Sequence, residues 1–414
     1  MAASPPTAPN LTQPKLRSVS GFARSHWPRH ESDELEAVVA VLAEGRTNSL
    51  VHGEETKAFE QEFADFVGMP FAIAVANGTL ALELSLRALG IEPGDEVVIP
   101  ARSFFATASA VVAIGAKPVF ADVESDSQNI DPRSVARVIG PETRAVVCVH
   151  LAGQPCDMDG LTAVCDEHDL LLVEDCAQAH GARWNSRAVG SFGDAGCFSF
   201  CTDKIMSTGG EGGMVVLRDE AVWRRAWAYK DHGKDPIGLA QASPAPAGEF
   251  RFCHSSFGSN FRMTEMQAAI GRAQLRKLPV WLEQRRRNAQ ALIEAASRHP
   301  AITRMHLPAK AEHAYYKCYL RLEPDAFPQS MNRPTILAIL HADGITCGSG
   351  SCPDMSREGA FADVAVRKDG ELPMARDLGQ RTIMFPVDHT LDEEGSRAIG
   401  TRLVEVIERL ESAG

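Results

Sequence analysis

The sequence predicts an α/β protein: a large domain with a mainly parallel seven-stranded sheet sandwiched by helices, followed by a smaller C-terminal α+β domain. Three observations support this prediction. Short runs rich in β-branched residues alternate with helical patterns, as in strand–helix–strand units. Several runs are apolar at nearly every position, which is expected of strands covered on both faces. After Pro300 a shorter mixture of strands and helices follows.

The predicted elements begin with two amphipathic helices at residues 31–45 and 54–67. The seven strands then lie at residues 72–75, 96–99, 118–121, 145–149, 170–173, 197–200 and 214–217. Most of these strands are separated by enough residues for a crossover helix, which parallel pairing requires.

The second half of the chain predicts a different organisation. The stretch 236–248 is rich in Pro, Ala and Gly and predicts a loop, and 264–297 predicts one long helix or two that break at Pro279. We then expect a strand at 315–322, a helix at 335–342, a strand at 382–385 and a closing helix at 391–410. The chain thus divides into a disordered tail (1–20), a large domain (21–255) and a linking helix with the small domain (256–414).

Composition excludes several classes of function. The 414 residues carry a net charge of −12, which argues against binding to nucleic acid or to anionic membranes. No apolar run is long enough to span a membrane. The ten cysteines form no C-x-x-C pair, so paired zinc knuckles and thioredoxin-like sites lack support. The histidines show no metal-ligand spacing either, and we predict no metal site. Free thiols in this number indicate a reducing compartment, and we expect a cytoplasmic protein.

Residues at the predicted strand ends carry the chemical signal, because ligands of open α/β sheets bind beyond the carboxyl ends of strands. Gly78 and Thr79 open the helix after the first strand, where they are compatible with a phosphate site or with a simple N-cap. Asp175 follows the fifth strand. It could bind a metal, pair with an arginine or hold a protonated heterocyclic nitrogen.

Lys204 follows the sixth strand, beside the glycine-rich turn 209–213. A buried lysine amine can attack carbonyl groups. The alternative is a lysine that extends its ammonium group to solvent and has no catalytic role. The turn matches neither a P-loop nor a dinucleotide fingerprint. A phosphate cradle, a strand-end carboxylate and a reactive lysine are together what pyridoxal phosphate (PLP) needs.

A series of motifs strengthens this interpretation. They lie at residues 77–82, 98–107, 115–120, 150–158, 174–181, 198–204, 210–213 and 258–263. With these motifs in this order, the chain resembles the DegT/DnrJ/EryC1/StrS family of PLP-dependent sugar aminotransferases of fold type I. The resemblance extends over residues 48–388, and Lys204 is kept where the dehydratases of the family carry His.

The resemblance implies a role for each matching residue around the cofactor ring. Lys204 would form the Schiff base with PLP and move the proton between substrate and cofactor. Asp175 would pair with the pyridinium nitrogen, and Gln178 would contact the 3-hydroxyl side. Phe104 would stack on the ring. Asp203 departs from the family pattern beside the lysine, and we expect its side chain to point away, because neighbours on an extended stretch alternate faces.

The resemblance also implies the phosphate site and the assembly. Gly78, Thr79 and Ser199 would bind the cofactor phosphate. Asn260 matches an asparagine that reaches the phosphate of the neighbouring subunit's cofactor, which implies a homodimer with shared active sites.

The expected reaction moves an amino group from an amino acid, L-glutamate, to a keto-sugar linked to a nucleoside diphosphate, with ping-pong kinetics. Two alternatives stay open. The same cofactor could serve a keto-cyclitol or an amino-cyclohexenone, as in 3-amino-5-hydroxybenzoate synthase, or the chain could be a non-catalytic PLP-binding sensor.

Overall fold

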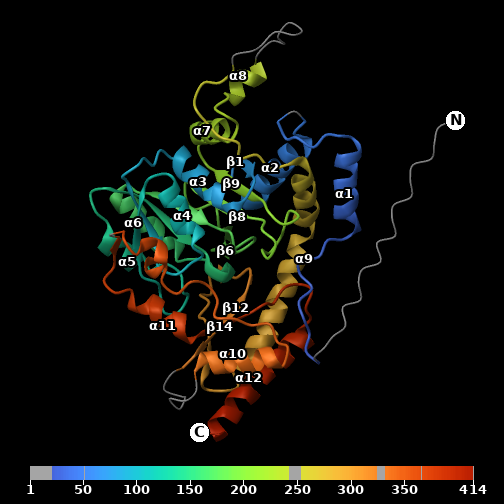
Figure 1. Cartoon of the computed structure of the whole chain (residues 1–414), viewed down its shortest axis with the longest axis vertical. Helices are drawn as coiled ribbons and strands as arrows, with labels where there is room; N and C mark the ends of the chain where they lie inside the picture. The colour runs from blue at the N-terminus through green and yellow to red at the C-terminus, as the bar shows by residue number, and fades with distance from the viewer. Residues whose placement is uncertain (1–20, 51, 242–252, 324–331, 365, 414) are drawn as a thin grey trace, which may run out of the picture.

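The computed structural model describes residues 21–50, 52–241, 253–323, 332–364 and 366–413, so the predicted tail 1–20 lies outside the described residues. An eight-stranded sheet, in the order β1-β9-β8-β5-β4-β2-β3-β13, forms the centre of the fold (Figure 1). Its strands are β1 Phe71–Val75, β2 Glu96–Pro100, β3 Lys117–Ala121, β4 Thr143–Val149, β5 Leu171–Asp175, β8 Ala195–Ser199, β9 Gly213–Leu217 and β13 Arg367–Lys368.

The sheet is mainly parallel, as predicted. Strands β8, β5, β4, β2, β3 and β13 pair in parallel, and β9 runs antiparallel to its neighbours β1 and β8. The seven predicted strands are all present. The additional strand, β13, comes from the C-terminal part of the chain and pairs with the edge strand β3, where Arg367 lies opposite Val119.

Helices cover both faces of the sheet, because alternate strand residues point to opposite sides. Helices α3 (Gly78–Ala88), α4 (Ala106–Ala113) and α7 (Glu220–Lys230) pack on one face. The other face is covered by α2 (Glu54–Val67) and α9 (Glu265–Ala296) at one end and by α5 (Pro132–Val138) and α6 (Met158–His168) at the other. The predicted α/β sandwich is therefore confirmed.

The C-terminal part has its own apolar core beside the lower half of α9 (Figure 1). It contains the antiparallel sheet β10-β12-β14 and the helices α10 and α12. Its elements are β10 Ile302–Arg304, β12 Cys318–Leu322, α10 Arg333–Ala342, α11 Pro373–Arg381, β14 Thr382–Phe385 and α12 Glu393–Ala413. A small third sheet joins β11 (Ala311–Glu312), β6 (Arg183–Trp184) and β7 (Arg187–Ala188). The domain boundary at residues 255–256 stays a prediction.

Of the two alternatives for residues 264–297, the structure has the single long helix. Helix α9 runs through Pro279 without a break, since packing against α1 (Ser32–Ala43), α2 and α12 along its length compensates for the missing backbone hydrogen bond. Two other local predictions differ from the structure. Part of the predicted loop at 236–248 is instead the short helix α8 (Pro236–Gln241), and residues 242–248 lie outside the described ranges. Strand β12 starts at Cys318, after Tyr315 has taken a left-handed conformation with φ of 49°.

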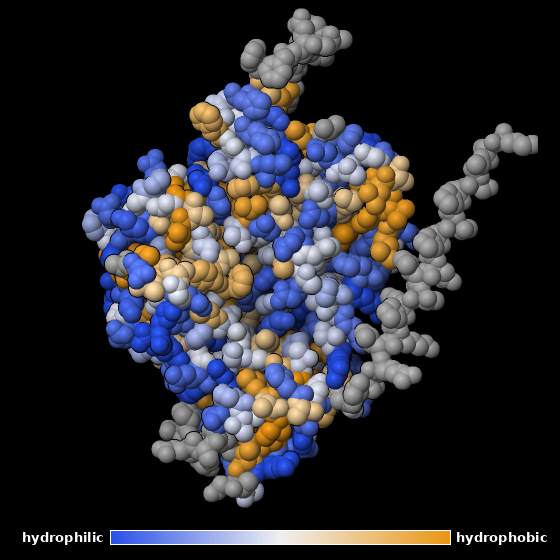
Figure 2. All heavy atoms as spheres, viewed as in Figure 1, coloured by the Kyte–Doolittle hydropathy of each residue, from blue (hydrophilic) through white to orange (hydrophobic). Residues whose placement is uncertain are grey.

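Helix α1 (Ser32–Ala43) presents part of its apolar face to solvent. Leu35, Val39 and Leu42 are 46%, 63% and 53% exposed, and Figure 2 shows an apolar patch over this helix. An apolar patch of this kind is typical of a protein interface. Within the described residues, no helix has the length and apolar character needed to cross a membrane.

Candidate active site

A cavity of about 760 Å³ opens where β1, β5 and β8 end. Seven of the predicted site residues line this cavity: Gly78, Thr79, Phe104, Asp175, Gln178, Ser199 and Lys204. They come from separate strand–helix units, and the parallel sheet brings them to one edge.

One end of the cavity is the N-terminus of α3. Asn77 caps this helix by accepting a hydrogen bond from the Leu80 N–H (3.0 Å), while the first N–H groups of the helix have no intrahelical partner. A Cβ atom on Gly78 would lie 2.6 Å from Ser199 Cβ, so only glycine allows this approach. The Ser199 hydroxyl therefore sits against free helix N–H groups, an arrangement suited to a phosphate.

Asp175 ends strand β5 and is 6% exposed. Its two carboxylate oxygens accept hydrogen bonds from the Ala177 N–H and from the Thr107 hydroxyl, both at 3.1 Å. Burial raises the pKa of Asp175, although these hydrogen bonds and the charge of Lys204 oppose the shift. In the described part of the chain, Asp175 belongs to no cluster of possible metal ligands. A protonated ring nitrogen would compensate for the buried charge.

Lys204 lies in the turn that follows β8. Its Nζ atom is 4.9 Å from the centroid of the Tyr316 ring, a cation–π distance. Its backbone carbonyl accepts a hydrogen bond from the Trp27 indole N–H at 2.7 Å. The Trp27 ring packs edge-on against Trp281 and His389, so distant parts of the chain fix the backbone of this lysine.

The prediction that Asp203 points away from the cavity is wrong. Asp203 lines the cavity beside Lys204 and accepts a hydrogen bond from the Tyr316 hydroxyl. Burial pushes the pKa of Asp203 up, but the Tyr316 hydroxyl and the charge of Lys204 outweigh this, so the pKa lies below its ordinary value. The segment is a turn, not an extended strand, so side chains there do not alternate.

Phe104 and Gln178 form parts of the cavity wall. Phe104 is 66% exposed, an unusual state for a large aromatic ring, and so offers its surface to a ligand. The Gln178 Oε1 atom accepts a hydrogen bond from the Ala152 N–H at 2.7 Å. This contact leaves the amide NH₂ group as the donor of Gln178.

Asn260 does not line this cavity. It is exposed and forms an isolated β-bridge with Asp231. Its predicted role at a neighbouring subunit is compatible with this placement and stays a prediction.

The sequence prediction missed several residues of the cavity. Thr107, which holds Asp175, lies inside one of the quoted motifs but has no signal of its own. Tyr316, Lys317 and Tyr319 also line the cavity, more than a hundred residues after Lys204. The signal that points to them is the segment 313–316, which by the family resemblance begins a strand that faces the active site.

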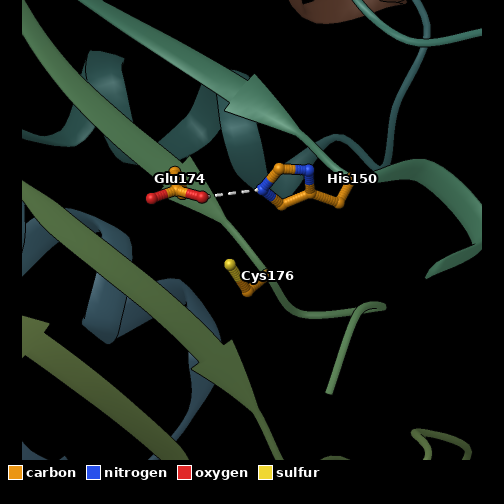
Figure 3. Close-up of side chains that lie close together, drawn as sticks. All are labelled: His150, Glu174 and Cys176. Atoms are coloured by element: carbon orange, nitrogen blue, oxygen red, sulfur yellow. Dashed lines mark hydrogen bonds and ion pairs between the residues drawn. The ribbon is translucent and has the colours of Figure 1, made fainter. Parts of the chain in front are cut away.

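Next to the cavity, His150, Glu174 and Cys176 lie close enough together to resemble a metal site (Figure 3). Their ligand atoms are, however, largely engaged by the protein. Glu174 accepts hydrogen bonds from the N–H groups of Gly190, Phe192 and Gly193 and contacts His150 Nε2 at 3.1 Å. His150 Nδ1 accepts the Cys156 N–H (3.0 Å), so the proton of the neutral ring is on Nε2. The cluster therefore anchors the loop after β7. Glu174, the acid next to Asp175 in the sequence, has hydrogen-bond partners for its carboxylate within the protein.

The cavity residues fit PLP. Hydroxyl and N–H donors suit its phosphate, a buried carboxylate suits its ring nitrogen, and a lysine amine from the neighbouring strand end suits its aldehyde. The close approach of Gly78 to Ser199 and the buried Asp175 carboxylate carry this fit.

Comparisons with known proteins agree with this fit. The model of the DegT/DnrJ/EryC1/StrS aminotransferase family matches residues 28–404. A solved aminotransferase from Psychrobacter cryohalolentis superposes with a TM-score of 0.90 at 43% identity, covering 94% of this chain and 100% of its own.

Two relatives of known name align with most of this chain and with most of their own length. A UDP-N-acetyl-3-dehydro-alpha-D-glucosamine 3-aminotransferase from Acidithiobacillus ferrooxidans is 34% identical over 381 residues, 91% of this chain and 95% of the relative. An L-glutamine:2-deoxy-scyllo-inosose aminotransferase from Micromonospora echinospora is 34% identical over 387 residues, 89% of this chain and 90% of the relative. The chain belongs to the DegT/DnrJ/EryC1/StrS family, and it is a PLP-dependent aminotransferase.

Proposed function

We propose that the enzyme transfers an amino group from L-glutamate to the ketone of a sugar linked to a nucleoside diphosphate. The observation that carries this proposal is the meeting of Lys204 and Asp175 in one cavity large enough for a cofactor and a substrate. The relative from Acidithiobacillus ferrooxidans, named for a UDP-linked amino sugar, supports the substrate class.

Lys204 is the proposed catalytic residue. Bound PLP supplies an electron sink, which makes the carbon that carries the amino group acidic. The Lys204 amine would move the proton from the reacting carbon of the donor to the cofactor in the first half-reaction, and from the cofactor to the former ketone carbon of the acceptor in the second. The hydrogen bond from Trp27 fixes the backbone from which this amine extends.

Asp175 keeps the ring nitrogen of the cofactor protonated in this proposal. Thr107 and the Ala177 N–H orient the carboxylate, and the low exposure of the site strengthens its attraction for a cationic nitrogen. Phe104 and Gln178 flank the ring. Gly78, Thr79 and Ser199 bind the phosphate, which anchors the cofactor while substrates exchange.

We also propose a homodimer in which Asn260 completes the partner's active site. Asn260 is exposed and lies off its own cavity, and the nearby Phe257 is 99% exposed. Mixed dimers test this arrangement. A Lys204→Ala chain paired with an Asn260→Ala chain regains one intact site if Asn260 acts across the interface. No activity above that of the parent dimers returns if Asn260 acts within its own chain.

We propose the cytoplasm as the location of the enzyme. All ten cysteines are free thiols, a pattern that suits a reducing compartment. Cell fractionation that finds the protein with an oxidising compartment would overturn this proposal.

A keto-cyclitol is the second candidate acceptor. The Micromonospora echinospora relative, whose name specifies a cyclitol and L-glutamine, covers about as much of the chain as the sugar-acting relative. The names of these two relatives therefore support both acceptor classes.

The test combines the purified, PLP-saturated enzyme with L-glutamate or L-glutamine and with panels of nucleotide-linked keto-sugars and keto-cyclitols. We expect 2-oxoglutarate to form from L-glutamate, with parallel double-reciprocal plots, when a keto-sugar is present. Turnover restricted to cyclitols would contradict the proposed substrate class. Failure to release amino groups from either donor, with PLP bound, would favour the sensor alternative.

A further inference from the structure

The active-site cavity contains a second amine that the proposed chemistry does not use. Among the described residues that line it, Lys204 and Lys317 are the two basic ones, and Asp175, Asp203 and Glu211 are the acidic ones. Once Lys204 is joined to the cofactor, Lys317 is the remaining lysine of this lining. Among these described lining residues, an anionic group on a substrate therefore has one candidate cation, Lys317.

Lys317 and Lys204 line the same cavity and contact the same aromatic ring. The two Nζ atoms are 4.8 and 4.9 Å from the centroid of the same Tyr316 ring. The described part of the chain offers Lys317 no carboxylate oxygen within 4.0 Å. Burial lowers the pKa of Lys317, and the charge of Asp203 opposes the shift. A poorly hydrated ammonium without a close counter-ion attracts an anion strongly.

The backbone of Lys317 is tied to the predicted cofactor site. Its N–H donates to the Ala152 carbonyl (3.3 Å), and the Ala152 N–H donates to Gln178 Oε1 (2.7 Å). These bonds belong to the short turn η1 (Leu151–Gly153), which fixes Lys317 relative to Gln178.

We propose that Lys317 binds the α-carboxylate of the amino-acid donor. This inference rests on the proposed function. In each half-reaction the reacting carbon lies beside Lys204, since the lysine moves its proton. The α-carboxylate is bonded directly to that carbon, at about 1.5 Å. The diphosphate of a nucleotide sugar is several bonds away from any ring ketone, so a cation that contacts the same Tyr316 ring as Lys204 fits the carboxylate better.

The same amine serves the second half-reaction without conflict. After the keto acid leaves, the acceptor brings hydroxyl groups next to its ketone, and an ammonium donates hydrogen bonds to hydroxyls as well. Lys317 thus distinguishes donors with a carboxylate on the reacting carbon from simple amines, while it accepts a sugar afterwards.

Calorimetric titration of the PLP-loaded enzyme with 2-oxoglutarate and with UDP tests this proposal, and it needs no turnover. We expect Lys317→Met to raise the Kd for 2-oxoglutarate about 10- to 100-fold, the range for losing a charge-assisted contact. The Kd for UDP should stay unchanged, and Lys317→Arg should bind 2-oxoglutarate more tightly than Lys317→Met. The matched control is Lys310→Met, which removes another lysine over an aromatic ring, 4.3 Å from Trp184 and outside the cavity.

An unchanged Kd for 2-oxoglutarate in Lys317→Met would overturn the proposal, as would equal weakening in Lys317→Arg. A rise in the Kd for UDP alone would assign Lys317 to the diphosphate and also overturn it. Because both ligands bind without reaction, a failure of the keto-sugar assay leaves this test intact. The two proposals can therefore fail separately.

Discussion

The two sides of the active-site cavity are built in different ways. The cofactor side consists of strand ends and helix starts of the main sheet, where Asp175, Ser199 and the N-terminus of α3 meet. The rest of the lining includes C-terminal residues such as Tyr316, Lys317 and Ser351, which distant segments of the chain bring to the cavity. This difference suggests a fixed cofactor site facing a substrate site that can change among family members. The predictions below test this separation.

The largest effect is expected for Lys204→Ala. Removal of the amine eliminates both the covalent link to PLP and the proton transfer, so turnover should fall by about 10⁴-fold or more. Steady-state assays of keto acid formation measure this loss. If the variant retained a tenth of the activity, another group would be the base.

The substitution Asp175→Asn is expected to have the second largest effect on turnover. The substitution removes the negative charge but keeps the shape, and breaking a buried charge pair costs about 3–5 kcal/mol. We expect kcat to fall by about 10²- to 10³-fold while the KM for the acceptor changes little. A large rise in acceptor KM with normal kcat would show that the two sides of the cavity are not separate.

Acid sensitivity should be common to both sides. Burial, together with the positive charges of Lys204 and Arg285, lowers the pKa of His180, which follows β5, to about 3. Burial and the charge of Arg286 lower the pKa of His313, in the C-terminal part of the chain, to about 3. The unfolded chain binds these protons below pH 6.5 and the folded chain does not, so stability falls as pH drops from 6.5 toward 3.

The size of this effect follows from the same shift. Each histidine is expected to make the free energy of unfolding about 2 kcal/mol lower at pH 5 than at pH 7. Denaturant titrations of the wild type and of His180→Phe at both pH values measure it. In the variant, the difference in free energy of unfolding between pH 7 and pH 5 should be smaller by the contribution of one histidine. An unchanged difference would contradict the assignment.

The smallest effect is expected for Tyr319→Phe. The Tyr319 hydroxyl accepts the Ser351 N–H at 3.0 Å and so holds the loop at Gly350 against the cavity. Loss of this bond should cost about 1 kcal/mol. We expect the acceptor KM to rise about fivefold with unchanged affinity for PLP, measured by cofactor titration. Weaker PLP binding with an unchanged acceptor KM would show that Tyr319 acts on the cofactor site, which would contradict the separation of the two sides.

The same contrast explains what the sequence could predict. The strands, the parallel sheet and the residues after β1, β5 and β8 follow from local apolar patterns and from the rule that strand ends meet at one edge. Strand β13 has two residues, which is too short for any periodic signal. Thr107 and Lys317 reach the cavity through tertiary packing, for which no local pattern exists. Asp203 was misplaced because the turn after β8 does not follow strand alternation.

The central claim is that one amine, that of Lys204, carries the cofactor opposite Asp175. Reduction of the PLP-loaded enzyme with borohydride, followed by peptide mass spectrometry, tests it most directly. The account predicts a single pyridoxyl group on the peptide that contains Lys204, absent in Lys204→Ala. A label on Lys317, or none on either lysine, would contradict it.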